Sequence, residues 1–453
     1  MNVTTQLSGI EISHEYEDLL CYGFDASILE GGLPCCVAWP KSAEEVVRIV
    51  KFASKNDLII VPRGAGTGMA GAVIPNISET IVLSFEKMRK IIEINAENMT
   101  ATLEPGTVNA RLQRELERFG LFYPPDPASL SICTIGGNVA TNAGGPRAVK
   151  YGVTRDYVLE LEAVLPDGYL VRLGGKTCKR VVGYDLKQLL IGAEGTLAAI
   201  TKIRLKVLPQ PADVATLLVQ FKDLFAAGNA VIKIFSSGII PRTMEFIDSS
   251  ALKAVEQYKP VGLPTNVEVL LLVELDGHAA AIQAEAEKIV QVCRALGGET
   301  AVAKDRPARE KLWEARRAIS PALYHLKPDK INEDIVVPVD QIPIALADLR
   351  RLSEESGISI VCFGHAGDGN IHVNIMTDRK AEEEYARAET LVKRIFEIAV
   401  AAGGSISGEH GIGLAKSPYL HMEINNRELQ LMKDIKHLID PRNIMNPGKI
   451  FSH

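Results

Sequence analysis

Hydrophobic and polar residues alternate strictly over residues 201–207, which predicts a strand with one buried face. Residues 158–165 and 169–173 are rich in apolar residues and flank the Pro-Asp-Gly sequence at 166–168, so they are expected to pair as a hairpin. The alternating strand ends at the Pro-Gln-Pro sequence of residues 209–211. Because proline interrupts regular structure, we place the first domain boundary there.

The second half of the chain has a different pattern. Expected strands at 214–221, 267–275, 358–363 and 371–376 alternate with long helical stretches near 278–296, 307–325, 341–356 and 381–402. This order is typical of an α+β domain, in which helices pack on an antiparallel sheet. A glycine-rich turn at 403–413 precedes the last segment. We therefore expect a first domain (1–210), a second α+β domain (211–415) and a C-terminal segment (416–453) that returns to the first domain.

Composition and charge narrow the class of protein. The 453 residues, 47% hydrophobic and 23% charged, suit a globular protein of about two or three domains. A net charge of −6 without a Lys/Arg block argues against a nucleic-acid groove. The seven cysteines form no C-x-x-C pair, so we expect no iron–sulfur cluster in this chain.

Targeting signals are not evident in the sequence. The N-terminal residues lack the cationic and apolar regions of a signal peptide. No run approaches the ~20 apolar residues that span a bilayer. We therefore expect a cytoplasmic protein without a transmembrane segment, which would meet any membrane at its surface.

A glycine-rich loop follows the short apolar run that ends at residue 62. Gly66, Gly68 and Gly71 match the G-x-G-x-x-G fingerprint of a Rossmann fold. A Rossmann loop must open onto a helix, and Pro75 excludes a normal helix interior so soon afterwards. The backbone N–H groups of such a loop still suit a pyrophosphate. Taken alone, the loop could equally be a mobile surface segment.

Two further glycine-rich segments favour a cofactor site. Residues 124–145 contain four glycines together with Asn138, Thr141 and Asn142, and residues 192–201 contain a Gly-Glu-Gly turn. Three such segments in this order, over about residues 30–209, resemble the FAD domain of the vanillyl-alcohol-oxidase and p-cresol-methylhydroxylase family. The resemblance implies an α+β fold with a two-part FAD-binding domain of this type and a second, substrate-binding domain with an antiparallel sheet.

The resemblance also implies a role for each glycine-rich segment. The first segment binds the pyrophosphate of FAD, the second contacts the next part of the cofactor, and the third contacts its adenine side. The implied FAD-binding residues are Arg63, Gly64, Ala65, Gly66, Thr67 and Gly68, then Pro127, Ser129, Gly136, Gly137, Asn138, Thr141, Asn142, Gly144 and Gly145, then Glu194, Gly195 and Ile200. Family members that attach flavin covalently carry a histidine in or near the first loop. Residues 63–68 contain none, so we expect FAD to be bound non-covalently.

Three of the nine histidines lie in two short glycine-rich segments. His365 follows one expected strand, and His372 lies in the next strand on the same face as Asn374. Glu409 and His410 are adjacent. Two imidazoles and one carboxylate, with a coordination position left open, suit zinc, manganese or ferrous iron. Each histidine taken alone could instead be a structural residue whose ring is satisfied by hydrogen bonds.

The segments at 363–375 and 407–416 resemble the C-terminal domain of the FAD-linked D-lactate, glycolate and D-2-hydroxyglutarate dehydrogenases, over about residues 212–451. In the metal-containing members, two histidines and a glutamate of these segments bind the metal, and the histidine after the glutamate is the catalytic base. The resemblance therefore implies His365, His372 and Glu409 as ligands and His410 as the base. Asp368 is a less suitable ligand, because a Gly-Asp-Gly turn uses an Asx residue for its own geometry.

A third match concerns an arginine. The segment LWEARRAIS at 312–320 resembles the part of the family in which an arginine grips the substrate carboxylate, here Arg316. A guanidinium fork suits a carboxylate better than an ammonium does. Arg317 would point roughly 100° away around the helix, and we expect it to be solvated. The alternative for Arg316 is an ordinary surface arginine.

The resemblance implies FAD-dependent oxidation of a small D-2-hydroxy acid, D-lactate or glycolate in preference, to the 2-oxo acid. His410 would remove the hydroxyl proton while a hydride passes to the flavin, on a substrate held by the divalent metal. Electrons would then pass to a separate acceptor, which is an electron-transfer flavoprotein, an iron–sulfur subunit or a quinone.

Other functions remain open. A diacid such as D-2-hydroxyglutarate would need a second cation, and in residues 330–338 Lys330 is the only positive residue beside Asn332, Glu333 and Asp334. This favours a monocarboxylate. The chain could also be a non-catalytic FAD subunit of a larger redox complex. A metallohydrolase without flavin is the third alternative, which a yellow purified protein would exclude.

Overall fold

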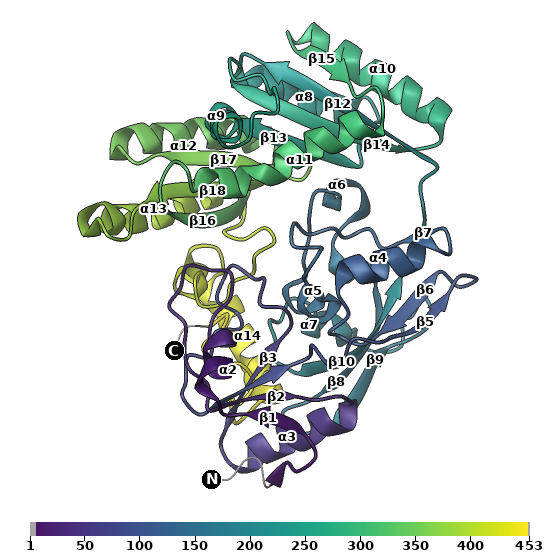
Figure 1. Cartoon of the computed structure of the whole chain (residues 1–453), viewed down its shortest axis with the longest axis vertical. Coiled ribbons are helices and arrows are strands. Elements are labelled where there is room, and N and C mark those ends of the chain that lie inside the picture. Colours follow the sequence, from purple (N-terminus) through teal and green to yellow (C-terminus); the bar gives the residue numbers. More distant parts are fainter. Residues whose placement is uncertain (1–5, 452–453) are drawn as a thin grey trace. The chain divides into compact units, whose positions relative to one another are not determined.

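The computed structural model describes residues 6–451, and the chain divides into two compact units (Figure 1). The described part of the first unit comprises residues 6–144, 153–210 and 409–451. The second unit comprises residues 145–152 and 211–408. The chain therefore crosses between the units four times, and one crossing follows Gln210, in the expected Pro-Gln-Pro sequence.

Two crossings differ from the domain limits expected from the sequence. The last falls between Gly408 and Glu409 rather than after residue 415, because the backbone N–H groups of Ile412 and Gly413 donate to Glu194 of the first unit. The short segment 145–152 belongs to the second unit, where the Lys150 ammonium donates to the backbone oxygen of Asp276 at 3.0 Å. No local sequence pattern reports either contact.

The first unit contains two main sheets. A four-stranded sheet has the order β1 (Glu11–Ser13), β2 (Cys36–Trp39), β4 (Thr80–Ser84) and β3 (Ile59–Arg63), with β2, β4 and β3 parallel. An antiparallel sheet has the order β5 (Ile91–Asn95), β6 (Thr100–Leu103), β10 (Ala199–Lys206), β8 (Val158–Val164) and β9 (Leu170–Gly174). The short strands β7 (Leu121–Phe122) and β11 (Leu208–Pro209) form a separate pair.

Helices and turns complete the first unit. They are α2 (Tyr16–Cys21), α3 (Ala43–Lys55), α4 (Asn109–Glu117), α5 (Ile135–Thr141), η1 (Thr154–Asp156), α7 (Lys187–Leu190), η3 (Ser417–Met422) and α14 (Asn426–Ile439). The core of this unit packs the apolar face of α3, with Val46, Ile49 and Val50, against Ile60 and Ile81 of the parallel sheet. This packing follows from helical spacing of the apolar residues in α3.

The alternating pattern that predicts β10 is confirmed. Ile203 and Leu205 are fully buried, whereas Lys202 and Arg204, which alternate with them, are half-buried. The expected hairpin of residues 158–173 is confirmed as well, because β8 and β9 pair in an antiparallel register.

The second unit is built on one seven-stranded sheet, and every pairing in it is antiparallel. Its order is β15 (Glu299–Val302), β12 (Asp213–Phe221), β14 (Val269–Gly277), β13 (Thr243–Asp248), β17 (Ile360–His365), β18 (Asn370–Thr377) and β16 (Asp329–Val336). Its helices are α6 (Ala148–Tyr151), α8 (Leu224–Ser236), α9 (Ser249–Tyr258), α10 (Ala279–Ala295), α11 (Arg306–Leu323), η2 (Val339–Gln341), α12 (Ile342–Ser356) and α13 (Glu382–Ala401).

The eight elements expected in this half lie within two residues of their observed bounds. Strand β13 was not expected, although it lies in the middle of the sheet. Helices α9 and α11 pack on the face that carries Ile247, Val361 and Phe363. That face of the sheet also carries Glu245, His365 and His372 of the candidate functional site.

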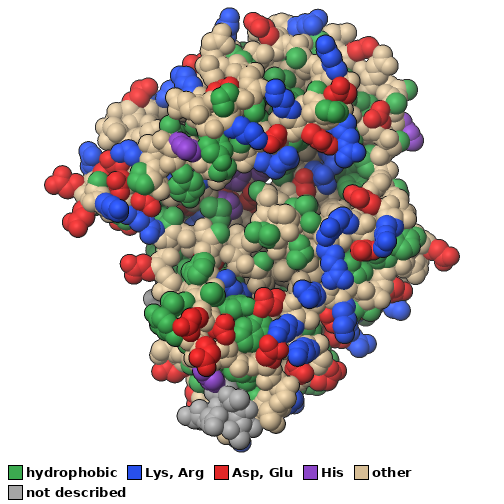
Figure 2. Space-filling view, viewed as in Figure 1, with side chains coloured by type: hydrophobic (Ala, Val, Ile, Leu, Met, Phe, Trp, Pro, Cys, Tyr) green, Lys and Arg blue, Asp and Glu red, His purple; other side chains and the backbone are tan. Residues whose placement is uncertain are grey.

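Among the helices of residues 6–451, none combines the length and apolar character needed to cross a bilayer. On the face seen in Figure 2, basic and acidic side chains are mixed over the surface.

Candidate functional site

The three glycine-rich segments line one pocket of the first unit. All FAD-binding residues expected from the sequence lie around it except Asn142 and Gly145. Asn142 directly follows α5 as its C-terminal cap in a left-handed conformation, and its side-chain oxygen accepts from the N–H of Arg155. Gly145 begins the segment that belongs to the second unit.

Glycine is required where the first loop approaches its neighbours. A Cβ atom at Gly64 would lie 2.4 Å from Oγ1 of Thr134, which accepts from the N–H of Gly137 in α5. Gly66 has a φ of +68°, and a Cβ there would lie 2.3 Å from the Arg63 guanidinium. The absence of a side chain at Gly64 therefore lets the loop backbone lie close to α5, and Gly66 adopts a left-handed backbone beside the Arg63 guanidinium.

The pocket contains a polar side chain that fits a bound cofactor. Asn138 is 3% exposed, and its Nδ2 has no hydrogen-bond partner among the described residues. Leaving such a donor unsatisfied costs about 1–3 kcal/mol, which an acceptor on a ligand would offset. Together with the glycine-rich backbone around it, this donor fits the FAD expected from the sequence.

Glu194 has a role that the sequence did not suggest. Its carboxylate accepts from the N–H groups of Ile412 and Gly413 at 2.7 and 2.8 Å. Burial raises the pKa of Glu194 to about 7, although these two hydrogen bonds act in the opposite direction. The side chain thus fastens the C-terminal segment to the third glycine turn, and its contact with the adenine side of FAD stays a prediction.

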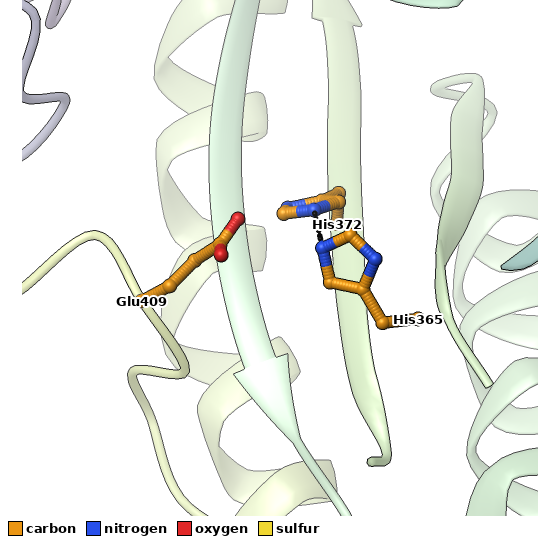
Figure 3. Close-up of side chains that lie close together, drawn as sticks. All are labelled: His365, His372 and Glu409. Atoms are coloured by element: carbon orange, nitrogen blue, oxygen red, sulfur yellow. Dashed lines mark hydrogen bonds between the residues drawn. The ribbon is translucent and has the colours of Figure 1, made fainter. Parts of the chain in front are cut away.

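The two expected histidine ligands lie side by side in the second unit. His365 ends β17 and His372 lies in β18, and both side chains are buried. Their Nε2 atoms are 3.4 Å apart. Figure 3 shows the two rings close to each other, with a dashed line between them. Two ring nitrogens at this distance need a proton or a cation between them, since two lone pairs facing each other would repel.

Glu409 completes this group. One ligand atom each from His365, His372 and Glu409 lie within 4.8 Å of one another, and Figure 3 shows the carboxylate turned toward the imidazoles. Glu409 directly follows Gly408, whose N–H donates to the Asp334 carboxylate at 2.8 Å. Asp368 is not part of the group. We refer to His365, His372 and Glu409 as the histidine–glutamate group.

Glu409 and its neighbour His410 also line the glycine-rich pocket of the first unit. The expected base therefore lies on the same pocket as the expected FAD-binding residues. Asp25, Phe85 and Thr134 line this pocket too and were not expected from the sequence.

A buried glutamate that the sequence analysis missed connects two of the expected residues. Glu245 of β13 lies 2.6 Å from Nδ1 of His365, and it accepts from Nε of Arg316 at 2.8 Å. Burial alone would raise the pKa of Glu245, but the charges and hydrogen bonds of His365 and Arg316 lower it. The only sequence signal for this residue is an acid flanked by apolar residues in the strand TMEFID, which also ends in Asp248.

Arg316 and Arg317 differ as expected from the phase of α11. Arg316 is half-buried and its guanidinium lies over the ring of Phe363, 4.7 Å from the ring centre. Arg317 is exposed. Arg316 is therefore no ordinary surface arginine, and its contact with a substrate carboxylate stays a prediction.

The donor atoms of the histidine–glutamate group fit a divalent metal. A histidine whose Nδ1 bonds to a carboxylate presents the lone pair of Nε2 to a metal, which is the common arrangement in metal sites. Two imidazoles and a carboxylate with open positions form a typical catalytic set.

Comparisons with known proteins agree with the two-part architecture. Residues 210–450 match the family of FAD linked oxidases, C-terminal domain, and residues 34–174 match the FAD binding domain family. The chain belongs to the FAD-linked oxidases and is an FAD-dependent oxidoreductase.

Three relatives are similar over nearly their whole lengths. The chain is 42% identical to glycolate oxidase subunit GlcD of Bacillus subtilis (strain 168), covering 96% of this chain and 92% of the relative. It is 36% identical to D-lactate dehydrogenase of Anaerostipes hadrus, covering 90% and 88%. It is 34% identical to D-2-hydroxyglutarate dehydrogenase of Stutzerimonas stutzeri (strain A1501), covering 96% and 95%.

Two solved structures confirm the expected fold. p-Cresol methylhydroxylase has a TM-score of 0.82 at 18% identity, covering 97% of this chain and 94% of its own. 4-Ethylphenol oxidase from Gulosibacter chungangensis has a TM-score of 0.80 at 17% identity, covering 98% and 94%.

Proposed function

We propose that this enzyme oxidises a small D-2-hydroxy acid, D-lactate or glycolate in preference, to the corresponding 2-oxo acid. The observation that carries the proposal is the histidine–glutamate group, because its carboxylate residue is adjacent to His410 on the glycine-rich pocket. The names of the glycolate oxidase and D-lactate dehydrogenase relatives support this substrate class.

The cofactors in this proposal are non-covalent FAD and a divalent zinc, manganese or iron ion. When bound, FAD accepts a hydride, and the metal lowers the pKa of a hydroxyl that it holds. The residues expected to hold the metal are His365, His372 and Glu409, and those expected to hold FAD surround Asn138.

The chain's own residues would then perform the remaining steps. His410 accepts the proton of the substrate hydroxyl as general base. Arg316 binds the substrate carboxylate through N–H donors other than those it directs at Glu245. The electrons leave to a separate acceptor in the cytoplasm or at the membrane surface, namely an electron-transfer flavoprotein, an iron–sulfur subunit or a quinone.

Turnover of four substrates with an artificial dye as electron acceptor tests the substrate preference. We expect the largest kcat/KM for D-lactate or glycolate, and smaller values for D-malate and D-2-hydroxyglutarate. A larger kcat/KM for D-2-hydroxyglutarate would overturn the preference for a monocarboxylate. It would also direct attention to Lys330, which is buried on β16 and donates to Oγ of Ser320 at 2.8 Å.

Removing the guanidinium of Arg316 should weaken substrate binding. We expect Arg316→Ala to raise KM and to lower kcat/KM by about 30- to 150-fold, which corresponds to roughly 2–3 kcal/mol for a charge-assisted hydrogen bond. Arg317→Ala, one residue away on the exposed side of α11, is the matched control and should leave kcat/KM nearly unchanged. Equal losses in the two variants would contradict the role of Arg316.

Denaturing the protein tests how FAD is bound. Acid precipitation should release all the flavin into the supernatant, because the first glycine loop has no histidine to bond to it. Flavin retained in the pellet would mean that a covalent bond exists. Peptide mapping would then examine His410 and Cys133, which line the pocket.

A further inference from the structure

The buried carboxylate of Glu245 stands at the centre of the second unit's sheet. Strand β13 places it between two neighbours, opposite Leu272 of β14 and opposite His365 of β17. Its side chain has no exposed surface. An ionised carboxylate in such a place costs several kcal/mol of desolvation unless close partners compensate for it. The identity of those partners indicates what the residue does.

Each oxygen of this carboxylate contacts a different predicted functional residue. Oε1 lies 2.6 Å from Nδ1 of His365. Oε2 accepts from Nε of Arg316 at 2.8 Å and lies 2.6 Å from its Nη2. One side chain thus connects an expected metal ligand with the arginine expected to bind the substrate carboxylate.

The contact with His365 determines the tautomer of its imidazole ring. An ionised carboxylate can only accept hydrogen bonds, so the proton of a neutral His365 must be on Nδ1. Nε2 then carries the lone pair, and this is the atom that lies 3.4 Å from Nε2 of His372. The negative charge on Glu245 also increases the basicity of Nε2 as a ligand.

The contact with Arg316 fixes the orientation of its guanidinium. The edge of the guanidinium that carries Nε and Nη2 faces the Glu245 carboxylate. The ring of Phe363 lies against the face of the guanidinium. Phe363 also contacts His372, with 5.3 Å between ring centres. An arginine held on one edge and one face loses little further side-chain entropy when it binds an anion, since its conformation is already selected.

We propose that Glu245 is a positioning residue that holds His365 in its metal-binding tautomer and Arg316 in its substrate-binding orientation. This inference rests on the proposed function, because it assumes the metal and the substrate carboxylate. It predicts that one neutral substitution at Glu245 weakens two separate binding events.

Glu245→Gln is the informative substitution, because glutamine has the same size and lacks the charge. If its oxygen accepts from His365, its amide N–H groups face the N–H groups of Arg316, and the two sets of donors repel. We expect metal affinity to fall by about 10- to 100-fold, the usual effect of losing the carboxylate behind a histidine ligand. KM for the hydroxy acid should rise in the same variant. Glu245→Asp keeps the charge and should recover part of the metal affinity.

The chain offers a matched control in Glu274 of β14, another buried carboxylate that contacts α11. Glu274 accepts from Nε1 of Trp313 at 2.8 Å and from Oγ1 of Thr216 at 3.0 Å. Within residues 6–451, no hydrogen bond or ion pair joins Glu274 to His365 or Arg316. Glu274→Gln should therefore leave metal affinity unchanged, even if it lowers Tm.

The measurement is metal affinity by titration against a chelator, with metal content read by mass spectrometry, on the purified FAD-loaded enzyme and its variants. Wild-type affinity in Glu245→Gln would overturn the inference. Equal loss of affinity in Glu245→Gln and Glu274→Gln, with equal loss of Tm, would overturn it too, because a general structural effect would then explain the result. If the wild type binds no zinc, manganese or iron, the metal site of the proposed function is wrong. This outcome is distinct from a failure of the inference about Glu245, because it is measured on the wild type before any variant is made.

Discussion

His410→Ala is expected to lose about 10²–10⁴-fold in the rate of flavin reduction while it keeps its metal and its FAD. The structure places Glu409 in the histidine–glutamate group and places both Glu409 and His410 on the glycine-rich pocket. Neighbouring side chains in extended or turn backbone point in different directions, so the two residues can serve different roles. The loss should therefore appear in the chemical step, because His410 is the residue expected to accept the hydroxyl proton.

Single-turnover flavin reduction, measured beside metal and flavin content, checks this expectation. His437→Ala is a suitable control, because His437 lies in α14 and belongs neither to the pocket nor to the histidine–glutamate group. Its rate should equal that of the wild type. A His410→Ala enzyme that loses its metal would show that His410 is a ligand, and our assignment of the two residues would be wrong.

Glu409→Ala is expected to lose metal and activity together. Removing one of three ligands leaves two imidazoles, which form an incomplete site for zinc, manganese or iron. FAD should stay bound, since most of the residues that line the pocket expected to hold it belong to the glycine-rich segments of the first unit. The variant should therefore be yellow, low in metal and unable to reduce its flavin with substrate.

Metal content by mass spectrometry and the visible absorbance of FAD test this second prediction. Asp368→Ala provides the matched control, because Asp368 lies in the turn between the two histidines but outside the group. It should retain its metal. If Glu409→Ala retains its metal while Asp368→Ala loses it, the acidic ligand has been assigned to the wrong residue.

Local patterns in the sequence predicted much of the fold. Strict alternation predicted β10, because a strand at the edge of a core buries every second side chain. Pro75 follows the first glycine loop where a Rossmann fold would begin a helix, so the sequence excluded that fold. The residues around Pro75 indeed form no helix. The three glycine-rich segments, which lie far apart in the sequence, also meet at one pocket, as expected from their composition and from the family resemblance.

Features that depend on distant contacts could not be predicted from the sequence. Glu245 is 120 residues from His365, and its short apolar strand resembles any buried segment. The segment 145–152 follows the second glycine loop without interruption, yet Lys150 and Tyr151 both bond to Asp276 of the second unit. The last crossing of the chain is fixed by Glu194, which lies more than two hundred residues before it. In each case one buried carboxylate decides the outcome, and only the folded chain shows its partners.

The central claim is that the metal and FAD act on the same hydroxy acid. Its most direct test is anaerobic reduction of the bound FAD by D-lactate or glycolate. The reduction is monitored in a single turnover as the loss of the visible absorbance of FAD. We predict fast reduction by the metal-loaded enzyme, little reduction after a chelator has removed the metal, and recovery when zinc, manganese or ferrous iron is restored. FAD that is reduced equally fast with and without metal would contradict the account, and so would FAD that neither substrate reduces in the metal-loaded enzyme.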